Sequence, residues 1–176
     1  MKFTLAIATA ILASVNSVSA LPSNSLSTRQ LPDDPSPVPV DVKNLDHDIS
    51  KKCGSTNFDY HEIYKAVQWG ILLQNADVRR GQKSNEFPKG RFPHSYTDTQ
   101  FDFGSDCPSD DNRQEFPLVT NGPYNGGLNN KKWGDHRVVY YYEPGEINEV
   151  NSNPVGYFCG TITHAGAETG KFIECE

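Results

Sequence analysis

The feature that most constrains this chain is a set of four cysteines in a sequence that begins with a secretory signal. Residues 1–20 have the three parts of such a signal: Lys2, an apolar run from Leu5 to Val15, and a small-residue cleavage site at Val18–Ala20. The apolar run is about half of the ~20 residues that a membrane span needs. We therefore expect a secreted, extracellular protein without a membrane anchor. Outside the cell, an even number of cysteines usually forms disulfides.

The positions of the cysteines leave the pairing open. They are Cys53, Cys107, Cys159 and Cys175, and no two of them lie at the short spacing of a zinc site. A metal is therefore not expected. Four cysteines allow three pairings, and the sequence alone does not select one.

The composition divides the chain into a leader and a folded domain. Residues 21–52 carry five prolines among Ser and Asp and have little apolar material to bury, so we expect a flexible leader or pro-segment. The folded domain is expected at 53–176. Lys51 and Lys52 are either a processing site or a plain basic pair on a solvated linker, and the sequence favours neither.

The pattern of apolar residues indicates an α+β fold. One amphipathic helix is expected after the capping pair Asp59 and Glu62, since its apolar stripe repeats at helical spacing: Ile63, Ala66, Val67, Gly70 and Ile71. The β-prone runs that follow are 115–119, 137–142, 157–163 and 171–175, and a Gly- and Asn-rich stretch at 122–134 predicts a long mobile loop. A single helix followed by several strands is typical of a helix packed on a twisted antiparallel sheet.

Four titratable residues lie on or beside these strands: His94, Glu115, Arg137 and His164. A carboxylate, a guanidinium and two imidazoles are sufficient for acid–base chemistry on a phosphodiester, without metal or cofactor. The alternative is structural: a cross-strand ion pair of small energetic value and two surface histidines. The other histidines have no such context and are expected to be structural or solvated.

Local sequence motifs around these residues resemble the fungal guanyl-specific ribonucleases, a family that also includes purine-preferring enzymes and ribotoxins. The motifs occur in the family's order over about 53–175, and they are Phe-Pro-His-Ser-Tyr (92–96), Glu-Phe-Pro-Leu-Val (115–119) with Asn-Gly-Pro-Tyr (121–124), Asp-His-Arg-Val-Val-Tyr (135–140), Cys-Gly-Thr-Ile-Thr-His-Ala-Gly-Ala (159–167) and Phe-Ile-Glu-Cys (172–175). The segment at 115–124 is most similar to the purine-preferring members. The resemblance implies the microbial ribonuclease fold, with the active site on the concave face of the sheet.

The resemblance also implies a role for each residue that matches a family motif. Glu115 would be the general base toward the ribose 2′-hydroxyl and His164 the general acid toward the 5′-oxygen. His94 would support the base, Arg137 would stabilise the phosphate, and Phe172 would pack at the site. The expected disulfides are Cys53–Cys175 and Cys107–Cys159. The implied reaction forms a 2′,3′-cyclic phosphate, which is then hydrolysed to a 3′-phosphate.

Two departures from the family pattern bear on rate and specificity. Phe92 stands where the family usually has Tyr, so a hydroxyl that donates to the phosphate is missing. The base-recognition loop of guanine-specific members contains a Glu, which the shorter stretch at 96–100 lacks. Tyr96 is expected to stack on a base, and Asp98 or Gln100 either accepts from the base edge or simply caps a turn. Preference for guanine or for purines in general is therefore left open.

The net charge of the domain limits which nucleic acids it is expected to bind. Residues 1–52 hold five basic and five acidic side chains, so the 11 basic and 17 acidic residues of 53–176 carry the whole net charge of −6. An acidic domain does not bind long nucleic acids through many phosphate contacts, which disfavours a ribotoxin and a DNA-binding protein. We expect a monomeric enzyme acting on single-stranded RNA. The alternative from another class is a secreted RNA- or protein-binding effector that keeps the fold without the catalysis.

Overall fold

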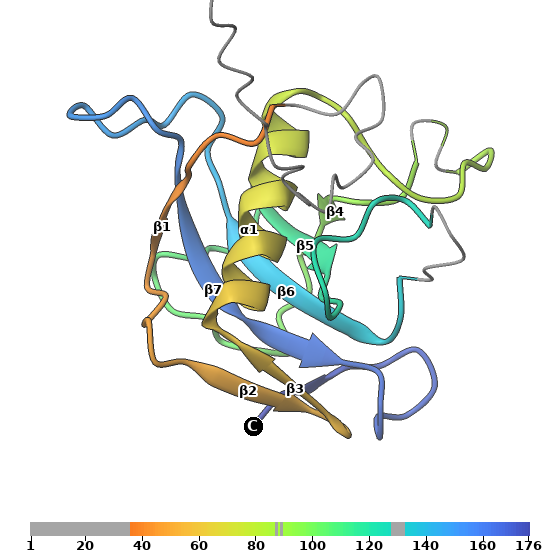
Figure 1. Cartoon of the computed structure of the whole chain (residues 1–176). Coiled ribbons are helices and arrows are strands. Elements are labelled where there is room, and N and C mark those ends of the chain that lie inside the picture. Colours follow the sequence, from red (N-terminus) through yellow and green to blue (C-terminus); the bar gives the residue numbers. More distant parts are fainter. Residues whose placement is uncertain (1–35, 87, 89, 128–132) are drawn as a thin grey trace, which may run out of the picture. The chain divides into compact units, whose positions relative to one another are not determined.

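The computed structural model describes residues 36–86, 88, 90–127 and 133–176 (Figure 1). The expected signal peptide and the leader up to residue 35 lie outside the described residues, as does part of the loop expected at 122–134. No helix in the described part of the chain has the length and apolar character that crossing a membrane requires.

The single helix expected from the sequence is confirmed as α1, Tyr60–Asn75. It begins in a capping box: the Glu62 amide donates to the Asp59 carboxylate at 3.0 Å, and the Asp59 amide donates to the Glu62 carboxylate at 3.2 Å. These bonds satisfy two amides that the first turn of a helix leaves without partners. All five residues of the predicted stripe are buried, so this face of the helix packs on the protein core.

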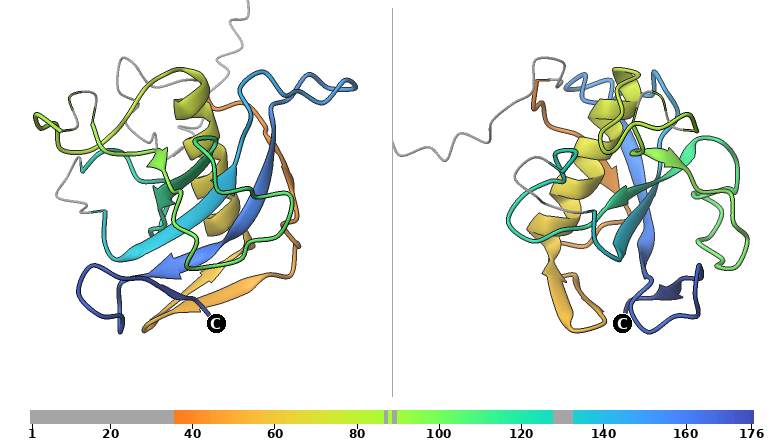
Figure 2. Two further views of the ribbon diagram at one scale, coloured as in Figure 1. Left: turned by 180° about the vertical axis from the view of Figure 1, so that it is seen from behind. Right: turned by 90° about the vertical axis from the view of Figure 1, so that its right-hand side faces the viewer.

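The sheet is mostly antiparallel, in the order β1-β7-β6-β5-β4 with β8 beside β7, and β2 and β3 form a separate hairpin. Among the described strands, only β1 and β7 pair in parallel. Figure 2 shows from two sides that α1 lies along one face of the sheet, as the predicted α+β fold requires. The strands are β1 Asp41–Lys43, β2 Ser50–Cys53, β3 Thr56–Asp59, β4 His94–Ser95, β5 Arg113–Pro117, β6 His136–Tyr141, β7 Val155–Thr163 and β8 Ile173–Glu174.

The expected start of the folded domain at Cys53 is too late. Residues Asp41–Lys43 form a parallel ladder with Val155–Tyr157 of β7, Val40 is buried, and Ser50–Cys53 forms β2. This part of the predicted leader is therefore structured. The strand was missed because it is three residues long and pairs with a partner more than a hundred residues away, so it has no local pattern.

Two apolar clusters lie on opposite faces of the central strands. The larger packs between α1 and the sheet, where a Cβ on Gly70 would come within 2.6 Å of the Tyr140 ring, so the glycine allows helix and sheet to approach closely. The smaller consists of Tyr96, Val139 and Ile162, with Phe101, Phe103, Cys159 and Phe172 packed against it. This smaller cluster lies on the face of the sheet that α1 does not cover.

Two disulfides tie the domain together, Cys53–Cys175 and Cys107–Cys159. These are the pairs that the family resemblance implies. They join residues 122 and 52 positions apart. In the chain-entropy model, loops of that length stabilise the folded state by about 5 and about 4 kcal/mol. The first bond fixes the C-terminus beside β2, and the second fixes the segment before β5 to β7.

Candidate active site

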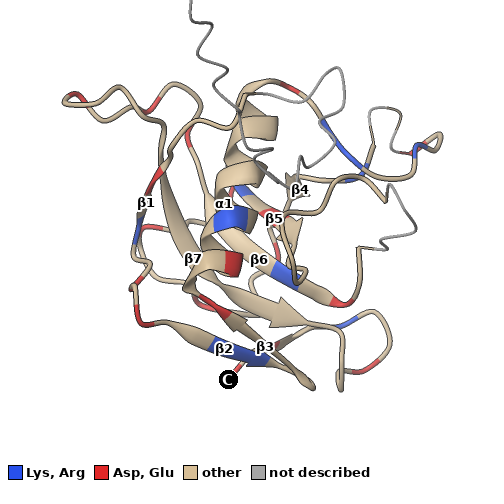
Figure 3. Ribbon diagram, viewed as in Figure 1, with Lys and Arg blue, Asp and Glu red and all other residues tan. Residues whose placement is uncertain are grey.

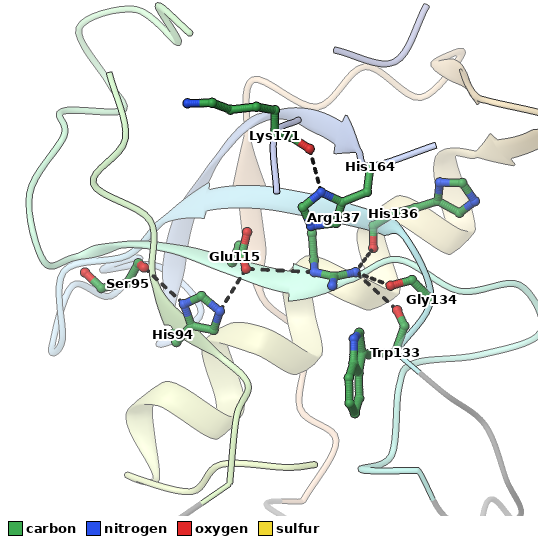
Figure 4. Close-up of polar contacts among 9 residues, drawn as sticks. All are labelled: His94, Ser95, Glu115, Trp133, Gly134, His136, Arg137, His164 and Lys171. Carbon is green, nitrogen blue, oxygen red and sulfur yellow. Dashed lines mark hydrogen bonds and ion pairs between the residues drawn. The ribbon is translucent and has the colours of Figure 1, made fainter. Parts of the chain in front are cut away.

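The strand register brings the four titratable residues to one face of the sheet. His94 pairs with Glu115, and Arg137 pairs with Pro117, which lies two residues after Glu115. Since side chains alternate between faces along a strand, residues two apart share a face. Arg137 also pairs with Ile162 of the smaller apolar cluster, and His164 follows Ile162 by two residues. Figure 4 shows the four side chains over this face, directed toward one another.

Glu115 and His94 are joined by a short hydrogen bond. His94 Nε2 lies 2.8 Å from Glu115 Oε1, and His94 Nδ1 lies 3.1 Å from the Ser95 carbonyl oxygen (Figure 4). A carbonyl only accepts, so Nδ1 carries a proton, and a second proton must lie between Nε2 and the carboxylate. The pair therefore holds either an imidazolium beside a carboxylate or an imidazole beside a carboxylic acid. Either way, one proton is shared between the two side chains.

The Glu115 carboxylate is buried, with 4% of the residue exposed. Its second oxygen, Oε2, is inaccessible and has no hydrogen-bond partner among the described residues. A buried oxygen in that state is costly unless a ligand supplies the missing donor. The carboxylate is thus held in position with one acceptor atom unsatisfied.

Arg137 supplies a buried cation next to this carboxylate. Its Nη1 donates to the carbonyl oxygens of Trp133, Gly134 and His136 at 3.2, 2.8 and 2.8 Å, and its Nε lies 3.8 Å from Glu115 Oε1. Burial lowers the pKa of Arg137, and the Glu115 carboxylate opposes that shift. A guanidinium nevertheless stays protonated in proteins. The guanidinium is therefore permanently charged, and its hydrogen bonds to the backbone fix its orientation.

His164 lies at the end of β7 with one nitrogen engaged. Its Nδ1 is 2.5 Å from the Lys171 carbonyl oxygen, so Nδ1 donates, and its ring stacks on Phe172 with the centroids 3.7 Å apart. Because Nδ1 holds its proton on the carbonyl, Nε2 is the atom that can gain or lose one. The ring is half-buried, which leaves it within reach of a ligand.

Phe92 forms the wall of the site between His94 and Arg137. It is 1% exposed, its ring stacks on His94 at 5.1 Å, and the Arg137 guanidinium carbon lies 5.0 Å from its centre. The ring thus covers one side of the cation and of the imidazole. Phe92 and Phe172 each pack on one of the two histidines.

Of the three residues expected to bind a base, Tyr96 is buried, whereas Asp98 and Gln100 are exposed. Tyr96 is only 6% exposed, and its ring meets Phe103 and Phe172 edge-on in the smaller apolar cluster. The expected open stacking face is therefore covered, and burial raises the pKa of its phenol. Asp98 accepts from the Gln100 amide at 2.8 Å, which is the turn-capping alternative, and the Gln100 side chain donates to the Phe172 carbonyl at 2.9 Å.

Trp133 is a residue of the site that sequence reasoning missed. Its carbonyl receives a hydrogen bond from Arg137, and its indole lies beneath the Arg91 guanidinium, 5.3 Å from the ring centre. The available signal was a tryptophan at the end of the Gly- and Asn-rich stretch, four residues before Arg137. Among the described residues, no group of three or more His, Cys, Asp or Glu side chains is arranged to hold a metal ion.

Comparison with known proteins gives consistent matches. A sequence model of the ribonuclease family matches residues 46–176. The chain is 33% identical over 129 residues to the guanyl-specific ribonuclease U1 of Ustilago sphaerogena, covering 72% of this chain and 95% of the relative. It is also 31% identical to the guanyl-specific ribonuclease F1 of Fusarium fujikuroi, covering 70% and 74%, and 29% identical to the extracellular guanyl-specific ribonuclease Fl1 of Gibberella baccata, covering 70% and 92%.

Proposed function

The chain belongs to the ribonuclease family, and we propose that it is a secreted endoribonuclease that cleaves single-stranded RNA 3′ to guanine, or to purines generally. Cleavage of RNA follows from the family. The observation that carries the finer proposal is the grouping of Glu115 between His94 and Arg137, with His164 on the same face of the sheet.

The proposed first step is an internal transesterification. Glu115 removes the proton of the ribose 2′-hydroxyl, and the 2′-oxygen attacks the adjacent phosphorus. His164 donates its Nε2 proton to the departing 5′-oxygen, so the products are a 2′,3′-cyclic phosphate and a 5′-hydroxyl. Water then attacks the cyclic phosphate with the two roles exchanged, giving a 3′-phosphate. Oε2 of Glu115 lacks a donor that the substrate hydroxyl would supply. Because this oxygen is inaccessible in the structure, the step requires neighbouring side chains to move aside.

His94 and Arg137 are proposed to act on the base and on the phosphate. The hydrogen bond between His94 Nε2 and Glu115 Oε1 holds the carboxyl group in one orientation. Arg137 has Nη1 engaged with backbone carbonyls, so Nε and Nη2 are the groups proposed to donate to the phosphate. A fixed cation aimed at developing negative charge lowers the barrier without reorganisation during the reaction. These four residues suffice for the chemistry without a metal or cofactor.

Base recognition is proposed for the loop at 96–100, next to His94. Relatives described as guanyl-specific support a guanine preference. Because the loop lacks the Glu typical of guanine-specific members, a broader purine preference is the competing form of the proposal. Stacking on Tyr96 requires its ring to turn out of the apolar cluster, whereas Asp98 and Gln100 are exposed as they stand.

Secretion is inferred from the signal pattern at 1–20, and one relative is described as extracellular. Action as a monomer and the absence of DNA cleavage also belong to the proposal. They have no bearing on the arrangement of the site itself.

The test is turnover of four dinucleoside phosphates that differ only in the base on the 5′ side of the phosphate. Fast cleavage of the guanine substrate, or of both purine substrates, supports the proposal and decides between its two forms. Equal rates for all four bases would contradict base preference. No cleavage of any of them by the folded, disulfide-bonded protein would instead favour the non-catalytic binding alternative.

A further inference from the structure

Arg113 is a buried cation that the proposed chemistry does not use. It opens β5 two residues before Glu115, so both side chains lie on the face of the sheet that α1 does not cover. It is 2% exposed. A buried arginine is costly unless its donors are satisfied, which raises the question of what it holds.

Each of the three guanidinium nitrogens of Arg113 donates to a backbone carbonyl. Nε reaches Tyr96 at 2.8 Å, Nη2 reaches Asp98 at 2.6 Å, and Nη1 reaches Cys107 at 3.0 Å. All three acceptors are neutral carbonyls of the segment 96–107, which is the first part of the connection between β4 and β5. The planar fork of arginine fixes the relative positions of its acceptors, which the flexible ammonium of lysine does not.

The same segment has little regular structure to hold it otherwise. Apart from the two-residue strand β4, its backbone meets the sheet through the Tyr96 amide, which donates to the Arg113 carbonyl at 2.8 Å. Further anchors are the Cys107–Cys159 disulfide and Phe103, which packs so closely on Gly160 that a Cβ there would lie 2.8 Å from its ring. Two side-chain hydrogen bonds add to them: Gln100 donates to the Phe172 carbonyl, and Asp106 accepts from Asn44. The Arg113 guanidinium also faces the rings of Tyr96 and Phe103, at 5.6 and 5.4 Å.

We propose that Arg113 is a positioning residue that determines base specificity: its guanidinium fixes the loop at 96–100 in the conformation that receives the base. This inference rests on the proposed function, in which that loop recognises the base. Carbonyls two residues apart, at Tyr96 and Asp98, are bound to one side chain. The backbone of Thr97, which lies between these two carbonyls, is therefore held in place as well.

The physical reason for a guanidinium at position 113 is that its N–H groups donate hydrogen bonds in fixed directions. An apolar side chain would fill the same space but leave the carbonyls of Tyr96, Asp98 and Cys107 without this donor, and those of Tyr96 and Cys107 are buried. The disulfide and Phe103 fix the far end of the segment, at 103 and 107. Arg113 connects that end to the end nearest His94, and so transmits the rigidity of the sheet to the loop.

The test compares Arg113→Met and Arg113→Lys with the wild-type protein on guanine, adenine and pyrimidine dinucleoside phosphates. The Met variant is expected to raise KM for the preferred base by about 10–100-fold and to lower the discrimination between bases by a similar factor, with kcat changed by less than about threefold. The Lys variant, which can reach fewer of the carbonyls, should fall between the two. Affinity for guanosine 3′-phosphate, measured by calorimetry, should fall in parallel with the rise in KM.

A matched control is Ile63→Ala, which opens a cavity in the core on the other face of the sheet. It should lower the melting temperature without changing the ratio between bases. Gly160→Ala, which displaces Phe103, should reproduce the specificity loss even if Arg113→Met does not fold.

Unchanged KM and base ratio in folded Arg113→Met, or an equal loss of kcat on every base, would overturn the proposal. The wild-type rates report on the proposed function, and the ratio of variant to wild type reports on Arg113. The two ideas therefore fail in distinguishable ways.

Discussion

Replacing Glu115 with Gln tests the proposed base while keeping the size of the side chain. Gln cannot accept the proton of the 2′-hydroxyl, so kcat on a purine dinucleoside phosphate is expected to fall by about 10²–10⁴-fold, the usual contribution of one general base. The amide also carries no charge to oppose Arg137. The same substitution should therefore have a measurable effect on stability.

The stability effect follows from the contact with Arg137. The two groups are 3.8 Å apart, and each side chain is about 5% exposed. At an effective dielectric constant of about 20, their attraction is about 4 kcal/mol. The three carbonyls on Nη1 and the amide dipole of Gln offset part of the loss, so we expect a net destabilisation of about 2–3 kcal/mol. For a domain of this size, that lowers the melting temperature by roughly 6–12 °C.

Binding should move in the opposite direction from catalysis. The Glu115 carboxylate competes with the substrate phosphate for Arg137, so guanosine 3′-phosphate is expected to inhibit Glu115→Gln at least as well as it inhibits the wild type. The assays are steady-state cleavage, inhibition by that nucleotide, and thermal unfolding followed by circular dichroism. Glu149→Gln is the control, because it removes one exposed carboxylate in the loop before β7.

The possible outcomes separate the two roles of Glu115. A kcat within threefold of the wild type would refute the assignment of the base. If the melting temperature falls without a loss of kcat, Glu115 is the structural ion-pair partner of the alternative interpretation. If kcat falls and the melting temperature does not, the attraction between Glu115 and Arg137 contributes nothing to folding, and the carbonyls alone stabilise the guanidinium.

Three further predictions concern neighbouring residues. His164→Gln should lower kcat by about 10²–10⁴-fold in steady-state cleavage of a purine dinucleoside phosphate. Phe92→Tyr should raise kcat by up to about tenfold if its hydroxyl reaches the phosphate, the effect of one hydrogen bond to a charged group, and an unchanged rate would show that it does not. Burial lowers the pKa of His136 in the folded protein. Its full contribution to stability is therefore present above the unfolded pKa of about 6.5 and is lost as the pH falls through the folded value; His136→Gln should make the decline in melting temperature between pH 7 and pH 5 shallower than in the wild type.

Local patterns predicted most of the fold. The helix was predictable because its cap and its stripe are contained in seventeen consecutive residues, Asp59–Asn75. The strands of 115–119, 137–142, 157–163 and 171–175 were each predicted within two residues of their observed ends. β1 was not predictable, since among the described strands it pairs only with β7 and two of its three residues are charged.

The site required the register, which the sequence does not contain. Glu115, Arg137 and His164 could be named from their motifs, but the pairings His94–Glu115 and Arg137–Pro117 put them on one face. For Tyr96 the sequence-based prediction was wrong, because tertiary contacts bury the ring. An aromatic in a polar loop is typical of an exposed stacking surface, yet Phe103 of the same connection and Phe172, far along the chain, cover it.

The acidity of the domain is compatible with its action on RNA. The surface carboxylates are screened over short distances, whereas a buried arginine acts on a phosphate in direct contact with it. Figure 3 marks Asp and Glu positions at several edges of the domain, many of them in loops, and salt screens such surface charges beyond about 8 Å. Both buried arginines on the open face, Arg113 and Arg137, are held by backbone carbonyls. Carbonyls fix a cation without cancelling its charge. The Glu115 carboxylate offsets part of the charge of Arg137. Under the proposed function, Arg137 attracts one phosphate at short range while the surface repels long polyanions, so recognition would depend on one phosphate and one base.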